Sequence, residues 1–266
     1  VVVSAFQGVT DELLSFQRSQ ERWNDKLEKL EKRHLDAVRV LVRRPASLRK
    51  KAIADVENLF KELENFLKKV TKWTSRDLDY AASFGERLSA YIVVAYLNSL
   101  KAKSSKLKAI YVDARDLVKT DNNFVNAAVD FQKTNRRIRN FFRRQRGIPV
   151  ITGFLGSTRK GETTTLGRGG SDYTAAIFGA ALGVKMIEIW TDVDGVMSAD
   201  PRLVKSAQVL PEISYEEAIE MAYFGAKVIH PATMLPAIKK RIPILIKNTF
   251  HPSAPGTLIS KNVTAC

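Results

Sequence analysis

The chain has 266 residues and 45% hydrophobic content, so it can bury a substantial core in one large domain or two small ones. It contains no run of 18 apolar residues, and its apolar start lacks the basic flank of a signal peptide, so we expect no membrane partner. The single cysteine, Cys266, excludes a disulfide framework or a multi-cysteine metal site within one chain. These features predict a cytoplasmic protein.

The net charge of +15 is unevenly distributed. Residues 1–150 carry 31 Lys and Arg against 18 Asp and Glu, whereas residues 151–266 carry 12 against 10. A basic half raises the hypothesis of nucleic-acid binding. The charges follow amphipathic helices without an aromatic stacking pattern, which favours the solvated surface of an enzyme with anionic substrates. Nucleic-acid binding is kept as the alternative.

Helices dominate the first hundred residues. Apolar residues recur at intervals of three and four from Trp23 to Leu41, and Pro45 ends that pattern. Ser75 is a suitable N-cap for a later helix, with Asp77 in its first turn. The predicted elements are a buried strand over 1–5 and helices over 11–43, from about 47, and from about 75 to 97.

After residue 100, short apolar runs alternate with helical patterns. The predicted strands are 107–112, 148–153, 186–190 and 242–246, and the predicted helices are 126–146, 171–182, 215–222 and 231–240. Alternation of this kind predicts an α/β fold with a mainly parallel sheet. The region of about 11–100 is then a helical insertion on the α/β body.

Two Gly-rich segments follow strand signals, at 153–158 and 163–172. Glycines and a serine before a helix leave backbone N–H groups free to bind an anion, above all phosphate. A P-loop is excluded because Glu162 stands where that motif requires lysine. The three histidines, His34, His230 and His251, are scattered, so we expect structural or exposed roles for them and no metal site.

Five ordered stretches resemble the aspartokinase family. The first combines Val3-Ser4-Ala5 with Gly8-Val9-Thr10-Asp11, and the others are 83–88, 164–176, 189–196 with 200–202, and 224–231. The resemblance covers nearly the whole chain and is almost continuous over 151–260. It implies the amino acid kinase fold, an αβα sandwich around a mainly parallel sheet. The single domain is then 1–266, with the nucleotide-binding part at about 150–266.

The resemblance also implies an activity, which is transfer of the ATP γ-phosphoryl group to the β-carboxylate of L-aspartate with Mg²⁺. This is the first step toward lysine, threonine and methionine. Arg168 and Glu86 would bind the carboxylate and ammonium groups of aspartate. The implied catalytic residues are Asp172 and Arg168. The implied substrate residues are Ser4, Thr10, Glu86, Phe154, Arg168 and Ser171. The implied nucleotide residues are Gly169, Gly170, Thr191, Asp192, Arg202, Lys227 and Val228.

The sequence departs from the family in three places. The family begins with a strand carrying Lys-Phe-Gly-Gly-Thr-Ser, which has no match here, so we expect the natural chain to begin earlier. Regulatory ACT domains usually follow the kinase part in the family, and we expect none within residues 1–266, which end soon after Ser260. Met197 stands where the family often has tyrosine near the nucleotide. The family commonly forms homodimers, which we carry over as an analogy. Another amino-acid kinase, for glutamate or acetylglutamate, and a non-catalytic regulatory remnant stay as alternatives.

Overall fold

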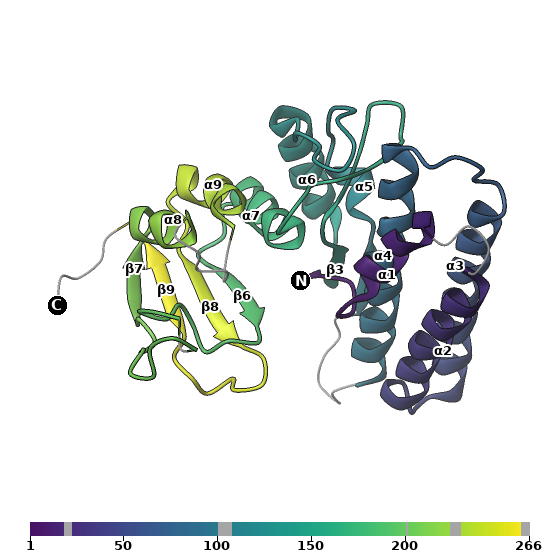
Figure 1. The fold of residues 1–266 in the computed structure, drawn as a ribbon, viewed down its shortest axis with the longest axis horizontal. Helices are drawn as coiled ribbons and strands as arrows, with labels where there is room; N and C mark the ends of the chain where they lie inside the picture. Colours follow the sequence, from purple (N-terminus) through teal and green to yellow (C-terminus); the bar gives the residue numbers. More distant parts are fainter. Residues whose placement is uncertain (19–22, 101–107, 201, 224–229, 262–266) are drawn as a thin grey trace. The chain divides into compact units, whose positions relative to one another are not determined.

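The computed structural model describes residues 1–18, 23–100, 108–200, 202–223 and 230–261. It divides into two compact units, Val1–Gly167 and Arg168–Cys266, which are called unit 1 and unit 2 below. Both units combine helices with a sheet whose strands pair mainly in parallel (Figure 1), which confirms the predicted α/β class. None of the described helices combines the length and hydropathy that a membrane span requires.

Unit 1 combines a parallel sheet, a short hairpin and a helical layer. Its strands are β1 (Val2–Val3), β2 (Ala109–Val112), β3 (Ile148–Thr152), β4 (Leu155–Ser157) and β5 (Thr163–Thr165). Its helices are α1 (Val9–Ser15), the 3₁₀ helix η1 (Phe16–Arg18), α2 (Trp23–Leu41), α3 (Ala46–Leu67), α4 (Ser75–Ser99), α5 (Ala114–Leu117) and α6 (Phe131–Arg144). The parallel sheet has the order β1-β3-β2, and β4 pairs with β5 in an antiparallel hairpin.

The described part of unit 2 contains a four-stranded sheet and three helices. Its elements are α7 (Gly170–Leu182), β6 (Ile187–Thr191), β7 (Glu212–Ser214), α8 (Tyr215–Tyr223), α9 (Pro231–Lys240), β8 (Ile244–Asn248) and β9 (Thr257–Ser260). The strand order is β6-β8-β9-β7, with β6 parallel to β8, β7 parallel to β9, and β8 antiparallel to β9. Its buried core includes Ile189, Met234 and Ile246.

The helical part of unit 1 has its own core. Leu13, Phe16, Leu30, Leu63 and Phe84 are buried in one cluster that joins α1, α2, α3 and α4. The predicted continuous helix over 11–43 is wrong, because α1 ends at Ser15 and the 3₁₀ helix η1 follows it. An apolar period alone does not reveal such a break.

His34 lies inside this core, as its apolar helical spacing indicated. Its ring stacks on Phe6 with 5.0 Å between centroids and meets the edge of Phe60 at 5.5 Å. Nδ1 donates a hydrogen bond to the Leu30 carbonyl at 2.7 Å. Burial lowers the pKa of His34, so the ring is neutral and packs as a core residue.

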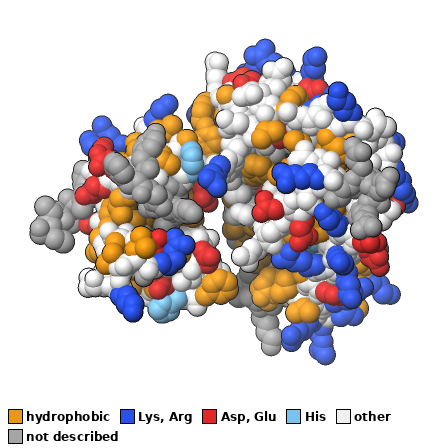
Figure 2. Space-filling view, in the orientation of Figure 1, with side chains coloured by type: hydrophobic (Ala, Val, Ile, Leu, Met, Phe, Trp, Pro, Cys, Tyr) orange, Lys and Arg blue, Asp and Glu red, His pale blue; other side chains and the backbone are white. Residues whose placement is uncertain are grey.

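Basic side chains are numerous on the surface of unit 1. Figure 2 shows Lys and Arg interspersed with Asp and Glu over this unit on the face in view. α6 is the most basic helix, with Thr134 and Ile138 as its buried residues. This interspersed pattern is typical of a solvated enzyme surface and adds no support to the nucleic-acid alternative.

The start of α4 corrects a sequence expectation. Thr74, and not Ser75, is the N-cap, and its side chain accepts a hydrogen bond from the Asp77 N–H at 3.3 Å. The Asp77 carboxylate accepts in return from the Thr74 N–H at 2.9 Å, which completes a capping box. Serine and threonine at neighbouring positions were equivalent in the sequence, so the cap was misplaced by one residue.

The capping box gives a stability prediction. We expect Thr74→Ala to lower the free energy of unfolding by ~1 kcal/mol, because it leaves an N–H group of the first turn unpaired. Ser75→Ala is the matched control and should change stability by less than about 0.5 kcal/mol. Urea unfolding followed by circular dichroism measures both. Equal losses in the two variants would contradict the assignment of Thr74 as the cap.

Candidate active site

The strands of the parallel sheet in unit 1 end at a common edge, where sequence analysis expected substrate residues. Ser4 follows β1, and Phe154 follows the neighbouring β3. The Gly153 N–H donates to the Val3 carbonyl at 2.8 Å, so these two strand ends stay paired as they leave the sheet. Ligands of open α/β sheets bind outside the carboxyl ends of strands. Ser4 and Phe154 occupy that position.

Glu86 on α4 reaches the end of β1 and is 3% exposed. One carboxylate oxygen, Oε1, accepts a hydrogen bond from the Ala5 N–H at 3.3 Å. The other, Oε2, is buried and has no hydrogen-bond partner among the described residues. Burial raises the pKa of Glu86 to about 8. A buried carboxyl group with one unused oxygen is suited to bind a cationic or donor group that enters the site.

Gly85 explains how α4 comes so close to β1. A Cβ atom at this position would lie 2.7 Å from the Ala5 Cβ and 3.5 Å from Val9 Cγ1. Any side chain here would therefore push α4 away from the residue that donates to Glu86. Thr10 is half-buried beside Val9 in the first turn of α1, the helix that packs against this part of α4. Glycine is the small residue that this contact requires.

Arg87 fixes the opposite side of α4 and was not identified from the sequence. Its guanidinium donates to both carboxylate oxygens of Glu62 on α3, at 3.0 and 2.7 Å. The Tyr80 hydroxyl donates to Glu62 Oε1 at 2.7 Å, and Phe84 lies under the guanidinium at 4.5 Å. Partial burial raises the pKa of Glu62, but the paired Arg87 holds it below the usual value. This pair could not be predicted from the sequence, because an ion pair between two helices leaves no periodic pattern or motif spacing when their packing is unknown.

The Gly-rich segment opens α7 in unit 2. Gly169 is the N-cap in the left-handed region at φ 70°, and no side chain caps the helix. Gly170 and Ser171 begin the helix, and Asp172 is its third residue. Gly169 takes the N-cap position because glycine reaches a positive φ without strain, so Asp172 lies inside the first turn. The backbone N–H groups of this turn stay available for an anion.

Two helix starts lie side by side in unit 2. A Cβ at Gly169 would be 3.0 Å from Thr233 Cγ2 and 3.3 Å from the Cβ of His230, the residues that open α9. Two N-termini add their positive potentials at one place. Arg168, beside this point in the chain, is exposed. Burial raises the pKa of Asp172 to about 6, so its carboxylate is mostly ionised at neutral pH.

The expected nucleotide residues follow the carboxyl end of β6. Thr191 ends the strand, and its hydroxyl donates to Asp192 Oδ1 at 3.2 Å. The neighbouring parallel strand β8 ends at Asn248, whose side-chain amide donates to Asp194 at 2.8 Å. These polar groups share one strand edge of unit 2, which is where such sheets bind ligands.

Arg202 is described, whereas Lys227 and Val228 lie outside the described residues. The Arg202 side chain is 81% exposed and forms two-pronged hydrogen bonds with Asp200, at 3.0 Å from Nε to Oδ1 and 2.7 Å from Nη2 to Oδ2. This exposed pair can open at small cost, so its guanidinium can transfer to a phosphate.

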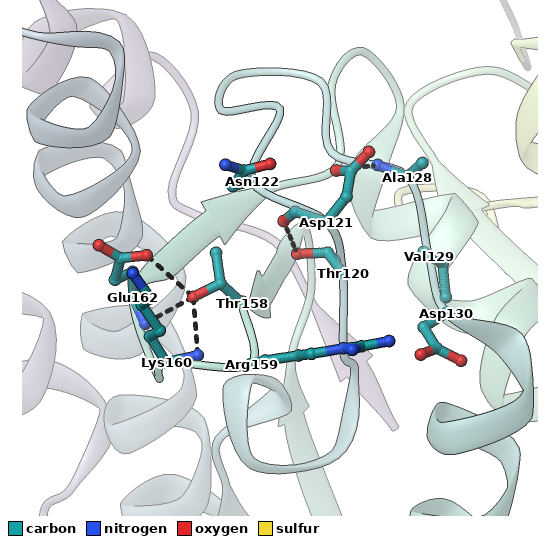
Figure 3. A pocket seen from close by; sticks show the side chains of 10 residues that line it. All are labelled: Thr120, Asp121, Asn122, Ala128, Val129, Asp130, Thr158, Arg159, Lys160 and Glu162. Carbon is teal, nitrogen blue, oxygen red and sulfur yellow. Dashed lines mark hydrogen bonds between the residues drawn. The ribbon is translucent and has the colours of Figure 1, made fainter.

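A cavity of about 520 Å³ lies in unit 1, and Glu86 is not among the residues that line it. Figure 3 shows it between the loop at 120–130 and the turn of the β4–β5 hairpin, with Arg159 extending toward Asp130. Thr158 Oγ1 donates to Glu162 and accepts from the N–H groups of Lys160 and Glu162. No residue expected in the substrate or nucleotide site lines it.

The structure thus places the expected site residues in two groups. Ser4, Thr10, Glu86 and Phe154 belong to unit 1, and Arg168 to Asp172 with Thr191, Asp192 and Arg202 belong to unit 2. Each group is ordered around strand ends or a helix start. Within the described residues, no group of three or more His, Cys, Asp or Glu side chains could hold a metal ion.

The chain is similar in sequence to known aspartokinases. The chain is 36% identical over 269 residues to the lysine-sensitive aspartokinase 3 of Escherichia coli, covering 97% of this chain and 57% of that protein. It is 42% identical over 207 residues to the chloroplastic aspartokinase 1 of Arabidopsis thaliana, covering 75% of this chain and 36% of that one. The chain therefore spans about a third to three fifths of the length of these relatives.

Solved structures of aspartokinases match the fold of this chain. The E. coli aspartokinase III structure in complex with aspartate and ADP matches with a TM-score of 0.88 at 33% identity, over 99% of this chain and 58% of that one. The aspartate kinase of Clostridium acetobutylicum matches with a TM-score of 0.77 at 30% identity, over 97% and 53%. A model of the amino acid kinase family matches residues 1–248. The chain belongs to the amino acid kinase family.

Proposed function

We propose that this chain carries the substrate and nucleotide sites of an aspartate kinase, which transfers the ATP γ-phosphoryl group to the β-carboxylate of L-aspartate. The observation that carries the proposal is the buried Glu86 carboxyl group with its unused oxygen. The ammonium group of an amino acid would pair with it and supply the hydrogen bonds that it lacks. The relatives described as aspartokinases support the choice of aspartate.

The remaining substrate groups match the other residues. Arg168 would bind a carboxylate of aspartate through its guanidinium, and Ser171 lies beside it in the first turn of α7. Ser4, Thr10 and Phe154 would line the pocket around Glu86, since they follow or flank the same strand ends. A ligand with two carboxylates and one ammonium uses both the acidic and the basic groups.

The nucleotide would bind to unit 2. The Gly169 and Gly170 N–H groups at the start of α7 are suited to its terminal phosphates, and Thr191 and Asp192 lie at the sheet edge. Arg202, Lys227 and Val228 are proposed as further nucleotide residues, because their sequence stretches resemble the aspartokinase family. Mg²⁺ would travel with ATP and be held largely by phosphate oxygens, because this ion commonly takes only one or two carboxylates from a protein. Asp172 is the candidate for such a carboxylate ligand, since it lies in the first turn of α7 beside the proposed phosphate-binding N–H groups.

The chemistry requires position and charge more than a base. A carboxylate with an ordinary pKa near 4 is already ionised and is itself the nucleophile. The protein must bring two anions together and neutralise the charge on the transferred group. Arg168 and the N–H groups of α7 would do so, with Mg²⁺. We further propose a cytoplasmic homodimer, by analogy with the family.

The proposal is tested by trapping aspartyl phosphate as its hydroxamate with the complete gene product, MgATP and L-aspartate. We expect Arg168→Ala to reduce kcat/KM for aspartate by about a hundredfold or more, since an ionic substrate contact is lost. Its Kd for the nucleotide should stay within about twofold of wild type. Arg159→Ala, in the cavity of Figure 3, is the control and should remain active.

Wild-type protein that phosphorylates glutamate but not aspartate would contradict the substrate assignment. An Arg168→Ala variant that loses nucleotide and aspartate together would place this residue with the nucleotide or with the fold.

The raised pKa of Glu86 gives a pH prediction. Its folded pKa of about 8 exceeds the ordinary value of 4.5 for glutamate, so the folded state binds the proton more tightly. The contribution of Glu86 to the free energy of unfolding is therefore fully present below about pH 4.5. It falls by on the order of 4 kcal/mol as the pH rises to 8. We expect Glu86→Gln to remove this loss, and to be more stable than wild type at pH 8 but not at pH 5. Urea unfolding across this range measures it.

The same variant should bind aspartate more weakly, since the amide cannot pair with an ammonium group. A Glu86→Gln protein that follows the wild-type stability curve at every pH would show that Glu86 is not the group that titrates.

A further inference from the structure

Asp79 is a buried carboxylate that neither the sequence motifs nor the proposed chemistry uses. It is 2% exposed and lies on α4, seven residues before Glu86. Seven residues are nearly two full turns, so both side chains leave the same face of the helix, about 10 Å apart along its axis. Within the described residues, Asp79 has no ion-pair partner.

Neutral donors surround the Asp79 carboxylate. The Val125 N–H donates to both oxygens, at 3.0 and 2.9 Å. The Thr165 N–H donates to Oδ2 at 2.9 Å, and the Thr165 hydroxyl donates to Oδ1 at 2.7 Å. Asp79 therefore joins α4 to the loop at 120–130 and to the end of β5. A buried carboxylate is retained where such hydrogen bonds replace water.

The loop that Asp79 binds is strained. Val125 has φ 73°, a left-handed conformation that a β-branched residue adopts only when its surroundings impose it. The next residue, Asn126, lies against Gly167, where a Cβ would collide with the Asn126 Oδ1 atom. Gly167 immediately precedes Arg168. The loop thus contacts the chain between β5 and Arg168.

Thr165 transmits the same constraint to Phe154. Its carbonyl accepts from the Ala127 N–H at 3.0 Å, and its N–H and hydroxyl both donate to Asp79. The following Leu166 N–H donates to the Phe154 carbonyl at 2.9 Å. Phe154 itself has φ 65°, so its conformation also depends on contacts of this kind. Two expected substrate residues, Phe154 and Arg168, therefore flank the segment that Asp79 binds.

We propose that Asp79 is a positioning residue for aspartate binding, which acts by fixing Val125 and Thr165 and so the segment between Phe154 and Arg168. This inference rests on the proposed function. Asp79 does not touch the substrate in this account. It holds α4, which carries Glu86, in register with the strand end that leads to Arg168.

The test uses the complete gene product and the Asp79→Asn variant, whose amide cannot accept all four hydrogen bonds. We expect KM for L-aspartate to rise about tenfold or more, because misplacement by even 1 Å is costly, while KM for MgATP changes by less than about threefold. Asp77→Asn is the matched control, since it removes a carboxylate from the same helix at its capping box. It should lower stability without changing KM for aspartate.

A rescue variant separates positioning from folding. Glycine reaches a positive φ without strain, so Val125→Gly in the Asp79→Asn background should restore part of the affinity for aspartate. Amide hydrogen exchange at Thr165 and Val125 reports the contacts independently of activity, and both amides should exchange faster in Asp79→Asn.

The outcomes are distinguishable. An active wild type, with KM for aspartate unchanged in Asp79→Asn, would overturn the positioning role and leave the proposed function intact. Equal increases in both KM values, without rescue by Val125→Gly, would also overturn it, since they indicate a general loss of structure. A wild type without aspartate-dependent turnover would contradict the proposed function and remove the substrate role of Asp79 with it, even where amide exchange reports the contacts.

Discussion

The close approach of α4 to the end of β1 is the contact on which the proposed substrate site depends. It exists because residue 85 is glycine, which leaves the space that the Ala5 side chain fills. The approach brings Glu86 within hydrogen-bond distance of the Ala5 N–H and buries its other oxygen. Desolvation then makes the charged form costly until a cation enters. One packing contact between a helix and a strand thereby creates the buried carboxyl group that we propose as the partner of the substrate ammonium group.

The two faces of α4 have different partners, and both limit its movement. The Arg87–Glu62 pair joins it to α3 in the helical part of unit 1, whereas Asp79 joins it to β5 and the loop at 120–130. A carboxylate that must bind a substrate within a fraction of an ångström needs such supports, because a loose helix would lose the geometry. Within the helical insertion expected from the sequence, α3 therefore supports α4, the helix that carries Glu86.

The sequence predicted the class of fold and most long elements, because apolar periods and caps identify them locally. It did not predict β4, β5, β7 or β9, which are three or four residues long and too short to show a period. The Gly-rich motifs indicated Arg168, Gly169 and Asp172 by their resemblance to a family. Asp79 and the Glu62–Arg87 pair could not be found in this way, since their importance arises from partners distant in the chain. That residues 1–266 form one domain, with its nucleotide-binding part at about 150–266, stays a prediction.

The most direct test of the Glu86 site is the proton balance of aspartate binding, measured by titration calorimetry at pH 7 in buffers of different ionisation enthalpy. Glu86 with a pKa of about 8 is mostly protonated at this pH before the substrate binds. An ammonium group beside it would favour the carboxylate, so binding should release close to one proton, and the release should vanish in Glu86→Gln. Binding that releases no proton in wild type, or the same amount in both proteins, would contradict the pairing of Glu86 with the substrate ammonium.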